Sequence, residues 1–215
     1  MTRPLITVRD LTIGHEGRVL CDGISFDIRQ GDCIMLCGAN GSGKTTLLKA
    51  ILRLHGKDVV MIPTRIPKAA GFTLKEFVRI CCFSMSDTGG HLSEADEKAL
   101  DRALDETGLS SLSDRDISTL SDGEFQKASI VSAIIRKASV ILLDEPTAFL
   151  DAENRISVLR TLRGLCRNAA VVFSTHDLHD GLTVATKVFA IGADRRFRCA
   201  EEDKEKCIET IFHKV

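Results

Sequence analysis

Apolar and polar positions alternate along two stretches near the start of the chain, residues 6–13 and 19–28. A period of two predicts half-buried antiparallel strands, and the turn between them is expected at residues 14–17. Residues 33–37 are instead a continuous apolar run that ends at a glycine. Such a run is typical of a strand that is buried on both faces.

The pattern after this buried run predicts a helix over 45–54 and then a short strand over 59–62. From about residue 65 to residue 137 the apolar positions recur at helical spacing. One helix of this region is expected from Ser93, which can cap it, to a stop at Gly108. The middle of the chain is therefore predicted to be helical.

Strand character returns at residues 140–143 and again at 169–174. Because each of these strands follows a helix, we expect a core built on a parallel α/β sheet. The tail, residues 201–215, has the pattern of a charged helix. Its apolar positions are expected to dock on the body of the protein; they are Cys207, Ile208, Ile211 and Phe212.

Composition excludes several classes of protein. Of the 215 residues, 44% are apolar and 27% are charged, which is enough for a buried core. Lys and Arg number 29 against 30 Asp and Glu, so a globally basic nucleic-acid binder is disfavoured. The eight cysteines show neither a CxxC pair nor zinc-finger spacing, and free thiols in a reducing cytosol are expected. No signal peptide and no apolar window long enough to span a membrane is expected, so the chain is predicted to be soluble.

A phosphate-binding motif follows the buried run. Residues 38–45 read Gly-Ala-Asn-Gly-Ser-Gly-Lys-Thr and fit G-x-x-x-x-G-K-[ST] between an expected strand and an expected helix. Its glycines let backbone N–H groups converge on phosphate oxygens at a helix N-terminus. Lys44 supplies a positive charge to the β and γ phosphates, and the Thr45 hydroxyl is placed to ligate Mg²⁺. The predicted ATP-binding residues here are Asn40, Gly41, Ser42, Gly43, Lys44, Thr45 and Thr46.

The apolar strand over 140–143 leads into two carboxylates, Asp144 and Glu145. Because neighbouring residues of a strand face opposite sides, the two are expected to point different ways while strand geometry persists. One carboxylate can hold a metal ion, and the other can accept a proton from an attacking water. We predict that Asp144 binds Mg²⁺ together with Thr45 and that Glu145 is the catalytic base.

Residues 120–124 read Leu-Ser-Asp-Gly-Glu, in which Ser121 and Glu124 predict a capping box at the start of a helix. Combined with the phosphate-binding motif and the carboxylates that precede Pro146, this segment resembles the signature of the ATP-binding cassette of ABC transporters. The resemblance covers nearly the whole chain, from Leu5 to about Gly192.

The resemblance implies an α/β fold with a P-loop NTPase core of mixed sheet and helices, over residues 1–64 and 138–200. It also implies an antiparallel β subdomain, an inserted helical subdomain with the signature over 65–137, and a C-terminal helix over 201–215. These segments are expected to form a single ABC ATPase domain.

The resemblance also implies roles for individual residues. The cassette works as a head-to-tail dimer that holds ATP between the P-loop of one copy and the signature of the other. Ser121, Asp122 and Gly123 would then meet the γ-phosphate bound to the second copy, from a positive helix N-terminus. Asp151 matches the D-loop that crosses the dimer interface. His176 matches the switch histidine that contacts the γ-phosphate.

Two positions depart from the family pattern. Relatives commonly carry a glutamine after the strand over 59–62, which touches Mg²⁺ or the lytic water, whereas this chain has Thr64. Since Thr64 is shorter and has no amide, we expect weaker coupling or slower turnover. At the adenine, where relatives stack a tyrosine, this chain has His15 and contains no tyrosine. An imidazole offers less stacking area and adds a pH dependence.

A narrower resemblance is carried by Leu-Ser-Asp-Gly-Glu together with Pro-Thr-Ala-Phe-Leu-Asp at 146–151. The two segments are similar to those of the ATPase subunits of iron-siderophore, haem and cobalamin importers. Residues 71–78 also resemble the segment of those subunits that meets the permease. This implies an ATPase that powers import, with membrane permease subunits as partners and, indirectly, a substrate-binding protein. Such a subunit is cytoplasmic and peripheral on the inner face of the membrane.

Two alternatives remain open. One is a soluble, non-transport ABC ATPase acting in translation or DNA repair, which is disfavoured by the single cassette and the lack of heptads or zinc spacing. The other is the ATPase of an exporter, which the paired segments at 120–124 and 146–151 make the weaker reading. No nucleic-acid partner is expected.

Overall fold

The computed structural model describes residues 3–56, 58–82 and 92–212, and it contains two sheets. The smaller is a hairpin of β1 (Ile6–His15) and β2 (Arg18–Ile28), and the larger has the strand order β4-β5-β6-β3-β7-β8. The strands of the larger sheet are β3 (Cys33–Gly38), β4 (Val59–Ile62), β5 (Val140–Leu143), β6 (Ala170–Ser174), β7 (Lys187–Ile191) and β8 (Phe197–Ala200).

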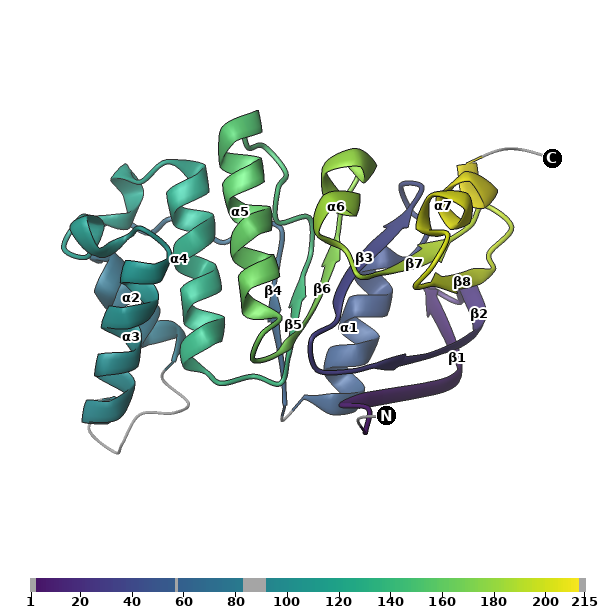
Figure 1. Ribbon diagram of the computed structural model, residues 1–215, viewed down its shortest axis with the longest axis horizontal. Helices are drawn as coiled ribbons and strands as arrows, with labels where there is room; N and C mark the ends of the chain where they lie inside the picture. Colours follow the sequence, from purple (N-terminus) through teal and green to yellow (C-terminus); the bar gives the residue numbers. More distant parts are fainter. Residues whose placement is uncertain (1–2, 57, 83–91, 213–215) are drawn as a thin grey trace.

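Helices lie on both sides of the larger sheet and extend beyond one end of it (Figure 1). They are α1 (Lys44–His55), α2 (Leu74–Cys81), α3 (Glu94–Glu106), α4 (Asp122–Ile135), α5 (Ala152–Leu165), α6 (Leu178–Val184) and α7 (Lys204–Phe212), with 3-10 turns η2 (Ser110–Leu112) and η3 (Ile117–Thr119). Strands β4, β5, β6, β3 and β7 pair in parallel, and β8 pairs antiparallel to β7. The predicted mixed α/β fold is confirmed.

The hairpin prediction is confirmed, with a tighter turn than expected. Strand β1 continues through Gly14 and His15, so only Glu16 and Gly17 connect the strands. Both have positive φ, 48° and 78°. Two such residues form the tight hairpin turn whose twist matches that of the flanking strands.

Two apolar layers sandwich the parallel strands, because successive side chains of each strand point to opposite faces. On one face, Ile34 and Leu36 of β3 pack with α1 and the hairpin. On the other, Cys33 and Met35 pack with α4, α5 and α7. All of β3 is buried, as its continuous apolar run predicts.

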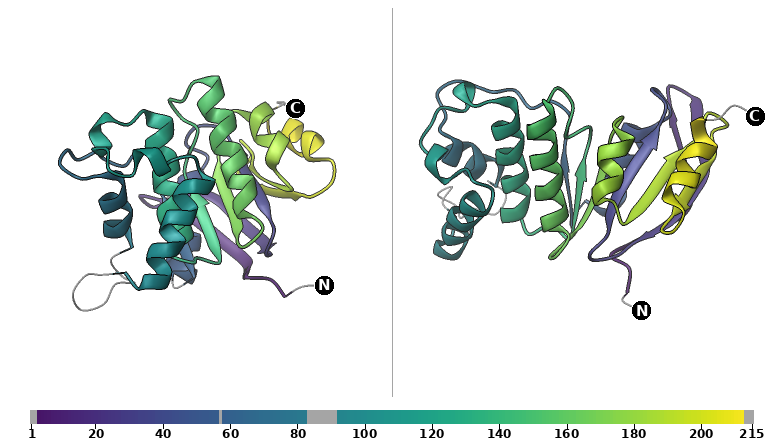
Figure 2. Two further views of the ribbon diagram at one scale, coloured as in Figure 1. Left: turned by 60° about the vertical axis from the view of Figure 1, so that its left-hand side comes forward. Right: turned by 45° about the horizontal axis from the view of Figure 1, so that its top comes forward.

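The helical region has an apolar cluster of its own, built from α2, α3 and α4. Figure 1 shows this region at the end of the molecule opposite the hairpin, and the right-hand view of Figure 2 shows the same separation. Helix α4 links the regions, since Phe125 and Val131 pack in the helical cluster while Ile130 and Ala133 pack on the sheet. Residues 65–137 as a separate subdomain stay a prediction, as do the other domain boundaries.

The C-terminal helix is shorter than expected within the described residues: α7 begins at Lys204 after a turn. Ile208 and Ile211 are buried on the sheet as predicted, with Cys207 half-buried beside them. The side chain of Phe212 lies outside what the structure describes. All eight cysteines are free thiols. Among the described residues, no helix is both long enough and apolar enough to cross a membrane.

Candidate nucleotide site

The P-loop lies between β3 and the start of α1, and its backbone depends on glycine. Gly43 has a φ of 108° at the N-cap of α1, and a Cβ there would lie 3.0 Å from Cδ1 of Ile13. No side chain caps α1. Its first N–H groups are therefore left to a ligand or to water, which is how a helix N-terminus binds phosphate.

Lys44 is buried and lies over the loop, where its ammonium group donates to the Gly38 carbonyl at 2.9 Å and the Ala39 carbonyl at 3.4 Å. Burial lowers the pKa of Lys44, and the carboxylates of Glu145 and Asp144 oppose this shift. The Oγ of Ser42 is buried and lacks a hydrogen-bond partner among the described residues. An orphaned hydroxyl beside a buried ammonium group fits a phosphate ligand.

A chain of hydrogen bonds joins the P-loop to the carboxyl ends of β5 and β6. The Thr45 hydroxyl donates to Oδ2 of Asp144 at 2.8 Å, and the Ser174 hydroxyl donates to Oδ1 of the same carboxylate at 2.8 Å. The backbone N–H of Glu145 donates in turn to Oγ of Ser174 at 2.8 Å. A hydroxyl and a carboxylate side by side are hard oxygen donors that suit Mg²⁺.

The two carboxylates differ from the expected strand geometry. Strand β5 ends at Leu143, and Glu145 has a positive φ of 50°. The alternation of a strand therefore does not reach Glu145, and it is the turn after β5 that sends the two carboxylates to different partners. A non-glycine residue in this conformation is strained, which is common at functional sites.

Glu145 and His176 meet at this edge of the sheet. Nε2 of His176 lies 2.9 Å from Oε1 of Glu145, and that oxygen is buried without a well-formed hydrogen bond to any described residue. Burial raises the pKa of the Glu145 carboxyl, while His176 and Lys44 oppose the rise. The imidazole of His176 is 54% exposed, so it can reach a ligand as well as Glu145.

His15 lies near the P-loop helix but not in a closed pocket. Its side chain is 75% exposed and borders a cavity of about 510 Å³ together with Thr45 and Thr46. Thr64 follows β4 and is half-buried. Among the described residues, its side chain forms no hydrogen bond. The roles of His15 at the adenine and of Thr64 in place of the family glutamine stay predictions.

The signature residues lie at the start of α4. Ser121 and Glu124 form the predicted capping box, with the Ser121 hydroxyl and backbone N–H both donating to Oε2 of Glu124 at 2.8 Å. A Cβ on Gly123 would lie 2.4 Å from Oδ1 of Asn154, so any other residue there would displace the Asn154 side chain. Asn154 is held by Asp151, which caps α5.

The chain thus groups its predicted site residues into two sets. The first set lies along one edge of the sheet, and contacts join several of its members: Lys44, Thr45, Asp144, Glu145 and His176. Residues 121–123 and Asp151 form the second set, because Asn154, which Asp151 holds by hydrogen bonds, lies against Gly123. Among the described hydrogen bonds and ion pairs, none joins residues 121–123 to the P-loop.

Three contributing residues were given no role at the sequence level. They are Ser174, which joins the Asp144 carboxylate to the Glu145 backbone, Lys68, which contacts the signature, and Arg155, which forms an ion pair with Asp177 next to His176. The contacts that reveal their roles join residues far apart in the sequence: Ser174 and Asp144 lie 30 positions apart, and Lys68 and Asp122 lie 54 apart. Spacing along the sequence does not reveal such pairs.

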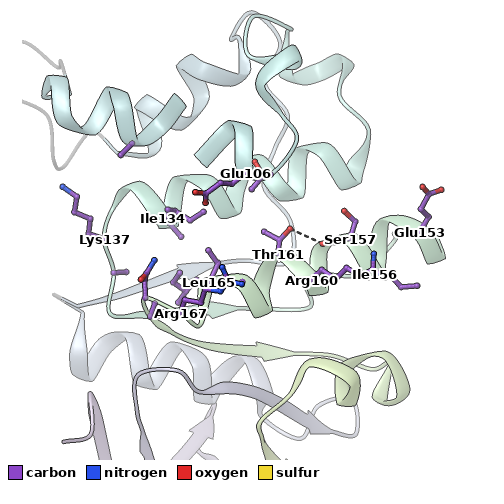
Figure 3. Close-up of a pocket in the computed structure, with 18 residues that line it drawn as sticks. Glu106, Ile134, Lys137, Glu153, Ile156, Ser157, Arg160, Thr161, Leu165 and Arg167 are labelled. Carbon is purple, nitrogen blue, oxygen red and sulfur yellow. Dashed lines mark hydrogen bonds between the residues drawn. The ribbon is translucent and has the colours of Figure 1, made fainter. Parts of the chain in front are cut away.

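A larger cavity lies elsewhere, between α5 and the helices α3 and α4, with a volume of about 1230 Å³ (Figure 3). Glu106, Lys137, Arg160 and Arg167 are among the side chains that line it. No predicted nucleotide-binding residue borders it. We therefore place the nucleotide site at the P-loop, whose residues suit phosphate, and not in this larger cavity.

A P-loop between a buried parallel strand and a helix, joined to a carboxylate at the end of another strand of the same sheet, defines a P-loop nucleoside triphosphatase. The sequence profile of the ABC transporter family matches residues 21–148. The chain therefore belongs to the ABC transporter family as an ATP-binding component, an ATPase, which confirms the resemblance seen in the sequence.

Similar proteins come from several transport systems. The achromobactin transport ATP-binding protein of Dickeya dadantii is 30% identical over 97% of this chain and 87% of its own length. An aliphatic sulfonates import ATP-binding protein of Paraburkholderia xenovorans is 31% identical over 88% of this chain and 78% of its own length. An inward-facing transporter structure described as metal-chelate type superposes with a TM-score of 0.85 at 26% identity, covering 96% of this chain and 88% of that one.

Proposed function

We propose that this chain is the ATP-hydrolysing subunit of an ABC importer for a metal chelate, such as an iron-siderophore, haem or cobalamin. The single observation that carries hydrolysis is the hydrogen-bonded chain from Thr45 through Asp144 and Ser174 to the backbone of Glu145. It ties a phosphate loop to a metal-binding carboxylate and to a candidate base.

In this proposal the P-loop binds the phosphates of ATP. The uncapped N-terminus of α1, the Ser42 hydroxyl and the Lys44 ammonium group supply the donors. Thr45 and Asp144 would hold Mg²⁺, which neutralises phosphate charge during transfer. Ser174 fixes the orientation of the Asp144 carboxylate through Oδ1 and leaves Oδ2 facing Thr45.

Glu145 is proposed to accept the proton of the attacking water through its carboxylate. Burial raises its pKa, which makes the carboxylate a better proton acceptor than an exposed one. His176, whose Nε2 lies 2.9 Å from Oε1 of Glu145, would contact the γ-phosphate with its exposed imidazole. Both residues occupy positions that the family uses for these roles.

A second copy is proposed to complete each site. Residues 121–123 have no described contact with the P-loop of their own chain, and their place at the N-terminus of α4 gives them a positive partial charge. Two copies arranged head to tail would bring this terminus to the phosphates bound to the partner. Asp151 would lie at the interface, since it is exposed beside the signature through Asn154.

The import role and its membrane partners come from the relatives. Both curated relatives described above are named for transport or import, so we propose that permease subunits hold this chain on the cytoplasmic face of the membrane. The structural neighbour of metal-chelate type and the paired segments at 120–124 and 146–151 support a chelate over a sulfonate. A substrate-binding protein would act indirectly, through the permease.

Reconstitution tests this proposal. The chain, co-purified with its permease in proteoliposomes, should hydrolyse ATP faster when a binding protein loaded with a ferric hydroxamate is added. Glu145→Gln should abolish this hydrolysis while ATP still binds. An aliphatic sulfonate as the stimulating ligand would contradict the substrate class. A chain that co-purifies with ribosomes or DNA and without a membrane protein would contradict the transport role itself.

A further inference from the structure

Lys68 lies outside α4 and contacts the signature, residues 120–124, at the start of that helix. Its ammonium group donates to Oδ1 of Asp122 at 2.6 Å and to the carbonyl of Leu120 at 2.8 Å. The same group lies 5.5 Å from the ring centroid of Phe125. Three contacts thus place one positive charge over the first turn of α4.

The carboxylate that Lys68 contacts creates an electrostatic problem for the proposed site. Asp122 is the first residue of α4 and is 67% exposed, at the end of the helix that would meet a γ-phosphate. A carboxylate suits a helix N-terminus on its own, but it repels an approaching phosphate. This repulsion strengthens when a closing interface removes water.

Lys68 belongs to the segment that follows Thr64, and this segment also touches the D-loop. The guanidinium carbon of Arg65 lies 4.7 Å from the ring centroid of Phe149, which is 70% exposed and precedes Asp151 by two positions. Residues 65–68 therefore contact both elements that the proposed dimer would bring to the partner's nucleotide. The contacts place basic side chains on both.

We propose that Lys68 is a positioning residue of the signature, which holds and neutralises Asp122 so that the N-terminus of α4 can receive the γ-phosphate bound to a second copy. This inference rests on the proposed function, because it requires the signature to act across a dimer. In the isolated subunit the Asp122 side chain is 67% exposed and the Lys68 side chain 25% exposed, so the ion pair is partly screened by water and contributes modestly to stability. Its effect should therefore appear in ATP-driven association far more than in folding.

The test uses Glu145→Gln as the parent, which should form a stable dimer with ATP and Mg²⁺. Lys68→Met in this parent should raise the dissociation constant of the ATP-bound dimer at least about tenfold. Adding Asp122→Asn should restore association, since no carboxylate is then left uncompensated. Lys68→Arg should associate like the parent. Urea midpoints should fall only slightly in Lys68→Met, which also loses the bond to the Leu120 carbonyl, and Asp122→Asn should not restore that small loss.

Lys75→Met is the matched control, because Lys75 pairs with Asp101 at 2.5 Å in the same helical region, and the two side chains are 24% and 60% exposed, close to the values for Lys68 and Asp122. It should dimerise like the parent. If the parent itself stays monomeric with ATP, the proposed function fails. If the parent dimerises but Lys68→Met does so equally well, or Asp122→Asn fails to rescue it, the role of Lys68 is wrong and the proposed function stands.

Discussion

Ser174 offers the sharpest test of how the site is built. Its hydroxyl is fully buried, donates to Oδ1 of Asp144 and accepts the N–H of Glu145. Ser174→Ala removes both bonds. We expect this substitution to destabilise the fold and to slow hydrolysis together.

The magnitude follows from the two groups that lose a partner. A hydrogen bond to a charged group contributes about 1.5–3 kcal/mol, and a buried N–H left unsatisfied costs about 1–3 kcal/mol. The lower ends of both ranges predict a loss of about 2.5 kcal/mol in the free energy of unfolding. Because the bond to its N–H also holds Glu145 in its strained left-handed conformation, kcat should fall at least about tenfold.

Urea unfolding and steady-state ATP hydrolysis measure the two effects. Ser129→Ala is the control, since Ser129 is equally buried but donates only to the Phe125 carbonyl within α4. That carbonyl keeps its helical hydrogen bond, so the control should change stability by less than about 1 kcal/mol. Equal losses in the two variants, or normal hydrolysis by Ser174→Ala, would refute the reasoning.

Three further outcomes are expected. The raised pKa of Glu145 means that the folded state favours its protonated form, so stability falls as pH rises through that pKa. Glu145→Gln should therefore unfold at higher urea than wild type at pH 8, with the gain vanishing below pH ~4, whereas an equal gain at both pH values would contradict the shift. Gly123→Ala, whose Cβ would meet Asn154 at 2.4 Å, should cost about 1–3 kcal/mol by urea unfolding. Adding Asn154→Ala should recover part of that loss, and no recovery would place the strain elsewhere. His15→Tyr should tighten ATP binding measured by calorimetry, because a phenol ring stacks over more area; an unchanged dissociation constant would remove His15 from the adenine site.

The parts of the fold that the sequence predicts well are those with strong local patterns. Strand β3 is recognised because its apolar run is unbroken and ends in the glycines of the P-loop. Helices α2, α3 and α4 begin at side chains that cap them, namely Thr73, Ser93 and Ser121. Capping is a contact between residues three apart, so it can be read directly from the sequence.

Strands β7 and β8 were not predicted, and the reason is physical. Strand β7 begins with Lys187, a charged residue that is only 3% exposed because Asp32 and Glu201 pair with it. Those partners lie 155 and 14 positions away, so the sequence shows a charge where the structure has a buried strand. Burial of a charge is decided by tertiary pairing, which periodicity does not reveal.

The candidate site divides in the same way. The P-loop and the pair Asp144 and Glu145 stand in recognisable segments, and the structure brings them together. The bridge through Ser174 depends on β6 lying between β5 and β3, which is a property of the sheet order. The ion pair of Lys68 with Asp122 depends on how the segment after β4 crosses the start of α4.

The central claim is that ATP is bound between two copies of this chain. The measurement that tests it most directly is the mass of Glu145→Gln in solution, by light scattering, with ATP and Mg²⁺ and then with ADP. The account predicts a doubled mass with ATP only, and a monomer with ATP when Ser121→Arg is added, although that variant should still bind nucleotide through its intact P-loop. A monomer in every condition, or a dimer that Ser121→Arg leaves unchanged, would contradict it.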